Sequence, residues 1–162
     1  IVNSTTYPGW GYMINQGATT IWETWQESDN TFSNCHPMFG TVTEWYYRWL
    51  GGIRPDPESP GFKEFTLAPS IPKRLEYVNC TYNSPHGKIV SNWRRGKGGL
   101  YQYEMTIPGS SIANVILSLN QYQKIEIKRK HGNIESKKIE GLQTGRFKLS
   151  GGEYIITVSK KN

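Results

Sequence analysis

The sequence lacks any apolar run of the roughly 20 residues that a membrane-spanning helix requires. Its first residues contain neither the basic nor the apolar region of a signal peptide. Only two of its 162 residues are cysteines, Cys35 and Cys80, and their spacing matches no metal-ligand motif. We therefore expect no membrane partner, no metal site and no cofactor, and two small buried cysteines in place of a disulfide framework.

Positive charge is plentiful but unevenly placed. Residues 1–58 hold six acids against two bases, a balance of −4, whereas residues 59–162 hold 17 bases against seven acids, a balance of +10. Most of these bases fall at expected turns and strand edges, as in 128–130 and 160–161. Edge lysines prevent strand-to-strand aggregation, so we interpret the basic charge as a solvated sheet surface and expect no nucleic-acid partner.

The first 50 residues carry the helical patterns and eleven of the 21 aromatic residues. Pro8 and Gly17 predict a helix between them, because proline suits a first turn and glycine a helix end. A polar loop follows over residues 18–36, and a second helix is expected from Pro37 to Leu50. Its apolar face consists of Val42, Trp45, Tyr46 and Trp49. Two helices joined by so long a loop cannot close a hydrophobic core alone.

A proline-rich segment separates this part from the rest of the chain. Residues 54–61 contain three prolines and a glycine, which we expect to exclude helices and strand ladders. Beyond it, apolar and polar residues alternate with period two, and turns are predicted at Pro108-Gly109 and Gly151-Gly152. Nine strands are expected, at 62–67, 75–82, 88–94, 100–107, 113–119, 124–128, 134–139, 146–149 and 154–158.

These patterns predict a mixed but mainly β fold in three parts. Residues 1–53 form an incomplete helical piece, residues 54–61 a linker, and residues 62–162 an antiparallel β-sandwich. Short strands at roughly ten-residue spacing are typical of such sandwiches.

The run Trp22-Glu23-Thr24-Trp25 is the stretch richest in chemistry. Indole faces pack against the C–H surfaces of sugars and lower the dielectric around a carboxyl group, which can then act as an acid or a base. The structural alternative is that both tryptophans belong to a core and that Glu23 is a hydrogen-bonded carboxylate. Composition alone leaves both interpretations open.

Many short segments resemble, in the right order, the bacterial α-L-rhamnosidase family of inverting glycoside hydrolases. The resemblance is clear over about the first 110 residues, and the remainder is similar only in its pattern of strands. It rests on residues 7–14, 16–23, His36, Gly40, 44–45, 51–53, 55–56, 60–62, 83–89 and 91–93.

The resemblance implies an (α/α)6 barrel followed by a C-terminal β-sandwich, with this chain supplying the last two helices of the barrel. Glu23 then matches the general base that activates water, and His36 matches a histidine that contacts the sugar. Trp22 and Trp25 flank the base and are assigned to substrate binding from their chemistry.

An inverting enzyme also needs a general acid, and the family's acid lies upstream in an Asp-rich motif ending Arg-Asp-Glu. This sequence has no such motif. Glu27 and Asp29 are interpreted as solvated loop acids and Glu44 as a structural residue of the second helix. The chain alone is therefore expected to be inactive.

Three hypotheses follow from these observations. The first is a C-terminal portion of an α-L-rhamnosidase, with a rhamnose-containing glycoside or polysaccharide and the rest of the barrel as partners. The second is a carbohydrate-binding β-sandwich with a platform of Trp93, Tyr101 and Tyr103, although alternating aromatics in strands more often form a core. The third, a basic nucleic-acid-binding β domain, has the weakest support. The sequence does not choose between the bacterial periplasm and cytoplasm.

Overall fold

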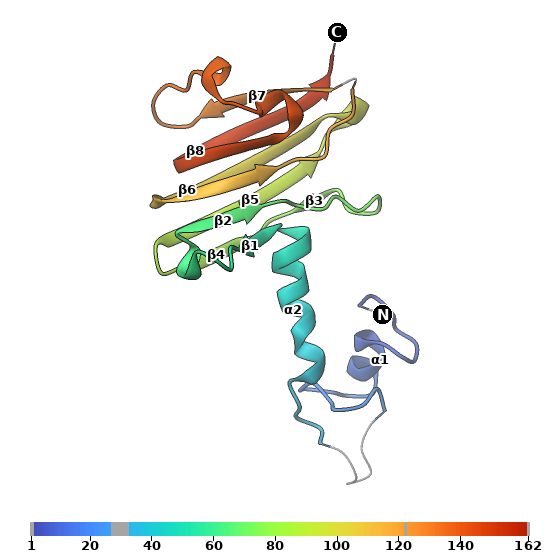
Figure 1. The fold of residues 1–162 in the computed structure, drawn as a ribbon. Helices are drawn as coiled ribbons and strands as arrows, with labels where there is room; N and C mark the ends of the chain where they lie inside the picture. The colour runs from blue at the N-terminus through green and yellow to red at the C-terminus, as the bar shows by residue number, and fades with distance from the viewer. Residues whose placement is uncertain (1, 27–32, 122, 162) are drawn as a thin grey trace. The chain divides into compact units, whose positions relative to one another are not determined.

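A computed structural model describes residues 2–26, 33–121 and 123–161. The chain divides into two compact units, residues 1–45 and 46–162. Figure 1 shows the helical segments in the first part of the chain and a sheet in the second. None of the helices in the described ranges has the length and apolar character needed to cross a membrane.

The first helix, α1, spans Trp10–Asn15 and is shorter than predicted. Gly9 precedes it, so Pro8 lies outside its first turn, whereas the predicted end is confirmed because Gly17 donates a 2.9 Å hydrogen bond to the Ile14 carbonyl. Met13 is buried, but Ile14 is 68% exposed. Only one side of this single helical stretch is therefore covered by the described residues.

The second helical segment is confirmed, but it changes its winding along its length. It begins as a 3-10 turn at Met38–Thr41, continues as α2 at Val42–Trp45, and ends as a π-helix at Tyr46–Leu50. The predicted apolar face is not a buried one, since Trp45 and Trp49 are 47% and 44% exposed.

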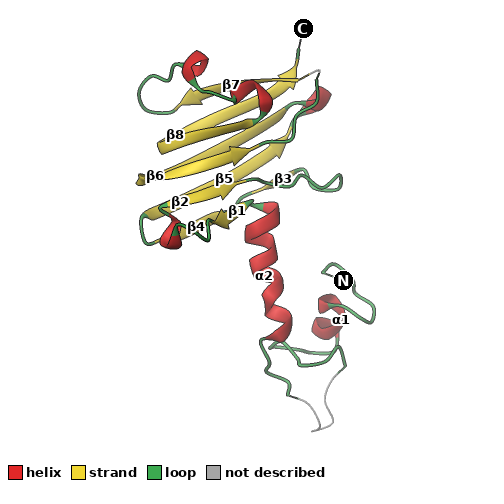
Figure 2. Cartoon of the chain, viewed as in Figure 1, coloured by secondary structure: helices red, strands yellow, loops and turns green. Residues whose placement is uncertain are grey.

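Eight strands form one hydrogen-bonded sheet in residues 46–162, shown in yellow in Figure 2. The central order is β1-β2-β6-β5-β3, with β4 also paired to β5, and β8 paired to both β6 and β7. The bounds are β1 Ile53–Pro55, β2 Glu64–Leu67, β3 Tyr77–Val78, β4 Thr81–Ser84, β5 Gly87–Arg95, β6 Tyr101–Ile116, β7 Gln123–Arg129 and β8 Arg146–Lys160.

Two long strands turn this sheet into a sandwich. The first half of β6 pairs with β5 and with the second half of β8, while the second half of β6 pairs with β2 and with the first half of β8. The two halves meet around one core that includes Phe65, Leu67, Tyr103, Met105 and Ile156. The mainly β fold is thus confirmed, and one strand pair, β2 with β6, departs from the antiparallel pattern.

The sequence prediction of turns at Pro108-Gly109 and Gly151-Gly152 was wrong. Both sites lie inside β6 and β8, beside a register shift between Ile107 and Ile112. A Cβ atom on Gly151 would lie 2.4 Å from the Gly109 Cα atom. The glycines permit a close backbone approach at a bulge, so each strand bends and continues.

Three further expectations differ from the structure. Arg54 and Pro55 belong to β1, which pairs with β2, so the proline-rich segment does take part in a ladder. Proline is tolerated there because β1 is an edge strand. Residues 134–139 form no strand but contain a 3-10 turn at Ser136–Lys138. Of the two free cysteines, Cys80 is buried, which raises the pKa of its thiol, but Cys35 is exposed.

The carbonyl groups that end the π-helix are satisfied by residues of the β unit. The Trp93 indole N–H donates to the Leu50 carbonyl at 2.9 Å, and the Ser70 N–H donates to the Trp49 carbonyl at 2.8 Å. Arg54 Nε donates to the Arg48 carbonyl at 3.0 Å. Helix ends leave carbonyls without partners in the helix, so these three bonds tie its last turn to the sheet.

A small charge cluster lies on the outer face of the sheet. Lys130 Nζ contacts Glu104 Oε1 and lies 3.6 Å from Glu153 Oε2. The hydrogen bond from Lys130 lowers the pKa of Glu104, and a second one from Asn92 acts in the same direction. The same contact raises the pKa of Lys130. Both shifts favour the charged pair at neutral pH.

Glu104 is expected to make stability depend on pH on the acid side. Because the pKa of Glu104 in the folded protein lies below its ordinary value of 4.5, its contribution is complete above that value and is lost as the pH falls through the folded pKa. The pair is partly exposed, so the loss should stay below about 1 kcal/mol. Urea unfolding at pH 7 and pH 3 measures it, with Glu104→Gln as comparison. An equal acid-side loss in Glu104→Gln would assign the effect to other carboxylates.

Candidate functional site

Two backbone segments pair at the neck of the loop that carries the candidate glutamate. The Glu23 N–H donates to the Ser33 carbonyl at 2.9 Å, and the His36 N–H donates to the Ile21 carbonyl at 2.7 Å. The Thr20 hydroxyl also contacts the Asn34 carbonyl. This pairing brings Glu23 and His36, which are 13 positions apart in the sequence, onto adjoining stretches of backbone.

The Glu23 carboxylate is held through one of its oxygen atoms. Oε2 accepts a 2.8 Å hydrogen bond from the Ser33 N–H, and Oε1 makes no hydrogen bond with the described residues. The side chain is half-buried. One oxygen therefore fixes the orientation of the carboxylate, and the other has lone pairs available for a water molecule or a hydroxyl group.

Trp25 is packed in a cluster of three aromatic rings. It stacks on Phe39 with ring centroids 4.1 Å apart and meets Trp10 edge-to-face at 5.1 Å. Such contacts fix an indole ring in a single orientation, because offset stacking and T-shaped pairing are the preferred aromatic geometries. Trp10 and Phe39 were not predicted from the sequence as supports of Trp25, although the density of aromatic residues in this region was a signal for them.

Trp22 is almost fully buried, with 4% of its surface exposed. Its burial and the backbone contact of Glu23 also fit the structural alternative, in which the motif serves the packing of the loop.

His36 presents one ring nitrogen to the backbone. Its Nδ1 atom accepts a 3.1 Å hydrogen bond from the Met38 N–H. In the neutral ring Nε2 is then the protonated nitrogen and acts as a donor. The side chain is half-buried.

The other carboxylates considered from the sequence add no second partner for Glu23. Glu27 and Asp29 lie outside the described residues. Glu44 is exposed on α2. Within the described ranges, no three His, Cys, Asp or Glu side chains come together as a metal site requires.

The prediction of an aromatic sugar-binding platform on the β-sandwich was wrong. Trp93 and Tyr103 are each 2% exposed and belong to the core, and burial raises the pKa of the Tyr103 hydroxyl. Tyr101 is half-buried, with the Arg95 guanidinium 5.7 Å from its ring centre. Alternation on a sheet that closes on itself places the Trp93 and Tyr103 rings inside the sandwich, so these two rings offer no open face to a sugar.

Two family models, both describing domains of bacterial α-L-rhamnosidases, match successive parts of the chain. A family model described as the bacterial α-L-rhamnosidase 6 hairpin glycosidase domain matches residues 1–50, and another, described as the bacterial α-L-rhamnosidase C-terminal domain, matches residues 52–132. An α-L-rhamnosidase from Formosa agariphila is 33% identical over 135 residues, which are 75% of this chain and 14% of the relative.

Solved structures show the same similarity. An α-L-rhamnosidase from Dictyoglumus thermophilum is 28% identical with a TM-score of 0.76, over 99% of this chain and 18% of that one. A Streptomyces avermitilis α-L-rhamnosidase complexed with L-rhamnose is 23% identical with a TM-score of 0.73, over 97% of this chain and 15% of that one, and shares the fold. The chain thus spans less than a fifth of the length of these relatives.

Proposed function

Because this chain belongs to the bacterial α-L-rhamnosidase family, we propose that the protein containing it hydrolyses terminal α-L-rhamnosyl linkages with inversion at the anomeric carbon. The observation that carries the proposal is the backbone-held Glu23 carboxylate within the segment that matches the glycosidase domain. The similarity to a structure complexed with L-rhamnose supports the choice of sugar.

In this proposal Glu23 is the general base. Its Oε1 atom takes a proton from a water molecule, whose oxygen then bonds to the anomeric carbon while the bond to the leaving oxygen breaks. Oε2 stays bound to the Ser33 N–H, so the carboxylate keeps its orientation during the transfer. Water fits between base and acid because the two carboxyl groups of an inverting enzyme lie roughly 6.5–9.5 Å apart.

Three neighbouring residues are proposed to bind the sugar or to shape its site. His36 donates from Nε2 to a sugar hydroxyl group, an assignment supported by the hydrogen bond that occupies Nδ1. Trp25 offers the part of its ring that Phe39 and Trp10 leave uncovered to the C–H face of the sugar. Trp22, being buried, acts mainly by excluding water beside Glu23.

The general acid is proposed to lie on another part of the same barrel. Residues 1–53 then form the end of the barrel, residues 54–61 the linker and residues 62–162 the C-terminal domain. The exposed aromatic residues Trp45 and Trp49 support contact with further barrel helices, because large apolar side chains are seldom left in water as a group.

Hydrolysis of a nitrophenyl α-L-rhamnoside tests the proposal. The complete protein is expected to release the sugar, with β-L-rhamnose as the first product in a proton NMR time course. The 162-residue chain alone is expected to show no turnover because it lacks the acid. Turnover by the pure chain would contradict the placement of the acid elsewhere, and α-L-rhamnose as the first product would contradict inversion.

A further inference from the structure

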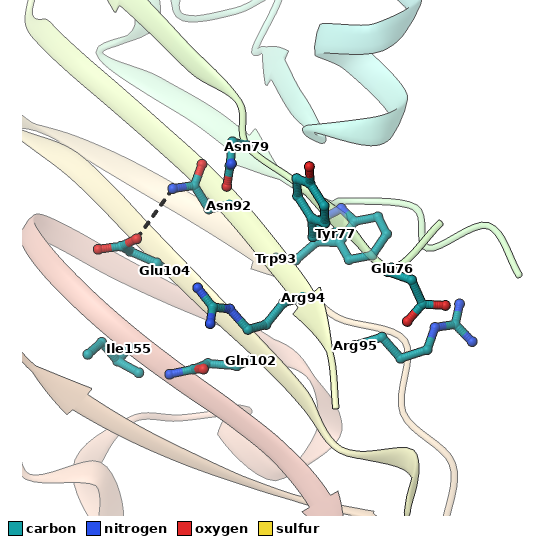
Figure 3. Close-up of a pocket in the computed structure, with 10 residues that line it drawn as sticks. All are labelled: Glu76, Tyr77, Asn79, Asn92, Trp93, Arg94, Arg95, Gln102, Glu104 and Ile155. Carbon is teal, nitrogen blue, oxygen red and sulfur yellow. Dashed lines mark hydrogen bonds between the residues drawn. The ribbon is translucent and has the colours of Figure 1, made fainter. Parts of the chain in front are cut away.

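A groove of about 690 Å³ crosses the outer face of β3, β5, β6 and β8. Figure 3 shows its lining, in which polar side chains stand along neighbouring strands. The groove lies within the second unit, and its size falls in the range of roughly 300–1,000 Å³ typical of ligand sites. The six residues that matter for its chemistry are Tyr77, Asn79, Asn92, Arg94, Gln102 and Glu104.

Strand register aligns these side chains in two adjacent rows. Tyr77 lies opposite Arg94, and Arg94 lies opposite Gln102. In the next row Asn92 lies opposite Glu104. Partners that are directly opposite share a face of the sheet, and neighbouring strands are about 4.8 Å apart. The rows therefore form a ladder of hydrogen-bonding groups with regular spacing.

One row is held in place by contacts within the protein. Asn92 Oδ1 accepts a 2.9 Å hydrogen bond from the Cys80 N–H, and its Nδ2 atom donates to Glu104 Oε2 at 3.3 Å. Lys130 holds the other oxygen of Glu104. The carboxylate is thus fixed and charged before any ligand arrives, which reduces the entropy lost on binding.

The other row consists of groups that are available to a ligand. Arg94 and Gln102 of this row make no side-chain hydrogen bond with the described residues, and neither does Asn79, which lines the groove outside the two rows. Tyr77 is 64% exposed at the sheet edge, so its ring face is accessible. Guanidinium and amide groups bind hydroxyl groups, and an exposed aromatic ring packs on the C–H face of a sugar.

The residues that line the groove carry equal numbers of negative and positive charges, which favours a ligand without net charge. Glu76 and Glu104 line it together with Arg94 and Arg95. A polyanion such as a nucleic acid would bring its charges beside the two carboxylates, at a cost in free energy. The lining suits a neutral molecule that is rich in hydroxyl groups.

We propose that this groove binds a neutral oligosaccharide, with Tyr77 packed on a sugar ring and Arg94, Gln102 and Glu104 hydrogen-bonded to its hydroxyl groups. The choice of rhamnose as the sugar rests on the proposed function, but the groove itself does not depend on it. It differs from the platform expected from the sequence because it lies on the outer face of the strands.

Titration calorimetry of the full chain tests the inference. The probes are an α-linked L-rhamnose trisaccharide, cellotriose as a second neutral sugar, and trigalacturonic acid as a charged one. We expect saturable binding of the rhamnose trisaccharide and weak or no binding of the acid. Binding of cellotriose in its place would support the groove but count against rhamnose. Absence of binding by both neutral sugars, or tighter binding of the acid, would overturn the inference.

Substitutions of residues that line the groove test whether the sugar binds there. Arg94→Ala and Gln102→Ala combined should raise Kd by about fivefold to 100-fold, since each of the two lost hydrogen bonds contributes roughly 0.5–1.5 kcal/mol. Tyr77→Ala should weaken binding, whereas Tyr77→Phe keeps the ring and should retain it. Lys148→Ala, on an exposed part of β8 outside the groove, is the matched control. Unchanged affinity in the double variant would overturn the proposed location.

Discussion

If Glu23 is the general base, as proposed, replacing it with glutamine in the complete protein is expected to lower kcat by about 10²–10⁴-fold, the usual contribution of such a base. The amide is nearly isosteric and its oxygen still accepts the hydrogen bond from the Ser33 N–H, so the loop should keep its conformation. What the variant loses is the ability to take a proton from water. Steady-state hydrolysis of a nitrophenyl α-L-rhamnoside measures the loss.

Two further variants separate a lost base from a damaged loop. Glu44→Gln removes the other described carboxylate of the first unit, which is exposed on α2, and should leave kcat within about twofold of the wild type. Glu23→Ala opens space for azide, an anion that attacks the anomeric carbon without a base. Added azide should restore turnover in Glu23→Ala and yield the inverted rhamnosyl azide. A kcat within threefold of wild type in Glu23→Gln would show that another group is the base.

The sequence predicted the loop of the candidate site and the helices on either side of it, but not the environment of the side chains in that loop. The Trp22–Trp25 motif identified the loop, and both helices exist near their predicted positions. What local patterns lack is the pairing of Glu23 with Ser33 and the stacking of Trp25 on Phe39. These contacts join positions that are 10 and 14 residues apart, and no periodicity in the sequence encodes them.

In the sheet, too, local sequence patterns predicted most of the strands, whereas contacts between distant residues could not be predicted. Alternation located most strands, but it split β6 and β8 at glycines that ordinarily mark turns. Whether Gly109 and Gly151 form turns or a bulge depends on their close approach across two strands. The expectation of edge lysines agrees with the sheet, since Lys124 and Lys128 lie on β7, which among the described strands pairs only with β8.

Replacing Trp93 with alanine is expected to lower the free energy of unfolding of the β unit by about 3–5 kcal/mol. The indole is 2% exposed in the main core, so the substitution leaves a cavity that the surrounding strands cannot fill without moving. It also removes the hydrogen bond to the Leu50 carbonyl. Urea unfolding of the full chain, followed by circular dichroism, measures the change.

Trp93→Phe divides this effect into packing and hydrogen bonding. Phenylalanine keeps most of the apolar volume but leaves the Leu50 carbonyl without its donor, which alone costs about 1–3 kcal/mol if the carbonyl stays buried. Tyr77→Ala, an aromatic truncation at an exposed position of the same sheet, should change stability by no more than about 0.5 kcal/mol. If Trp93→Ala costs no more than Tyr77→Ala, the indole neither fills the core nor ties the helix end to the sheet. A second outcome is that Trp93→Phe lowers the free energy of unfolding while only the β-sheet signal in the circular dichroism spectrum changes and the helical signal does not. That result would contradict the role of the indole in tying the helix end to the sheet, but not its role in filling the core.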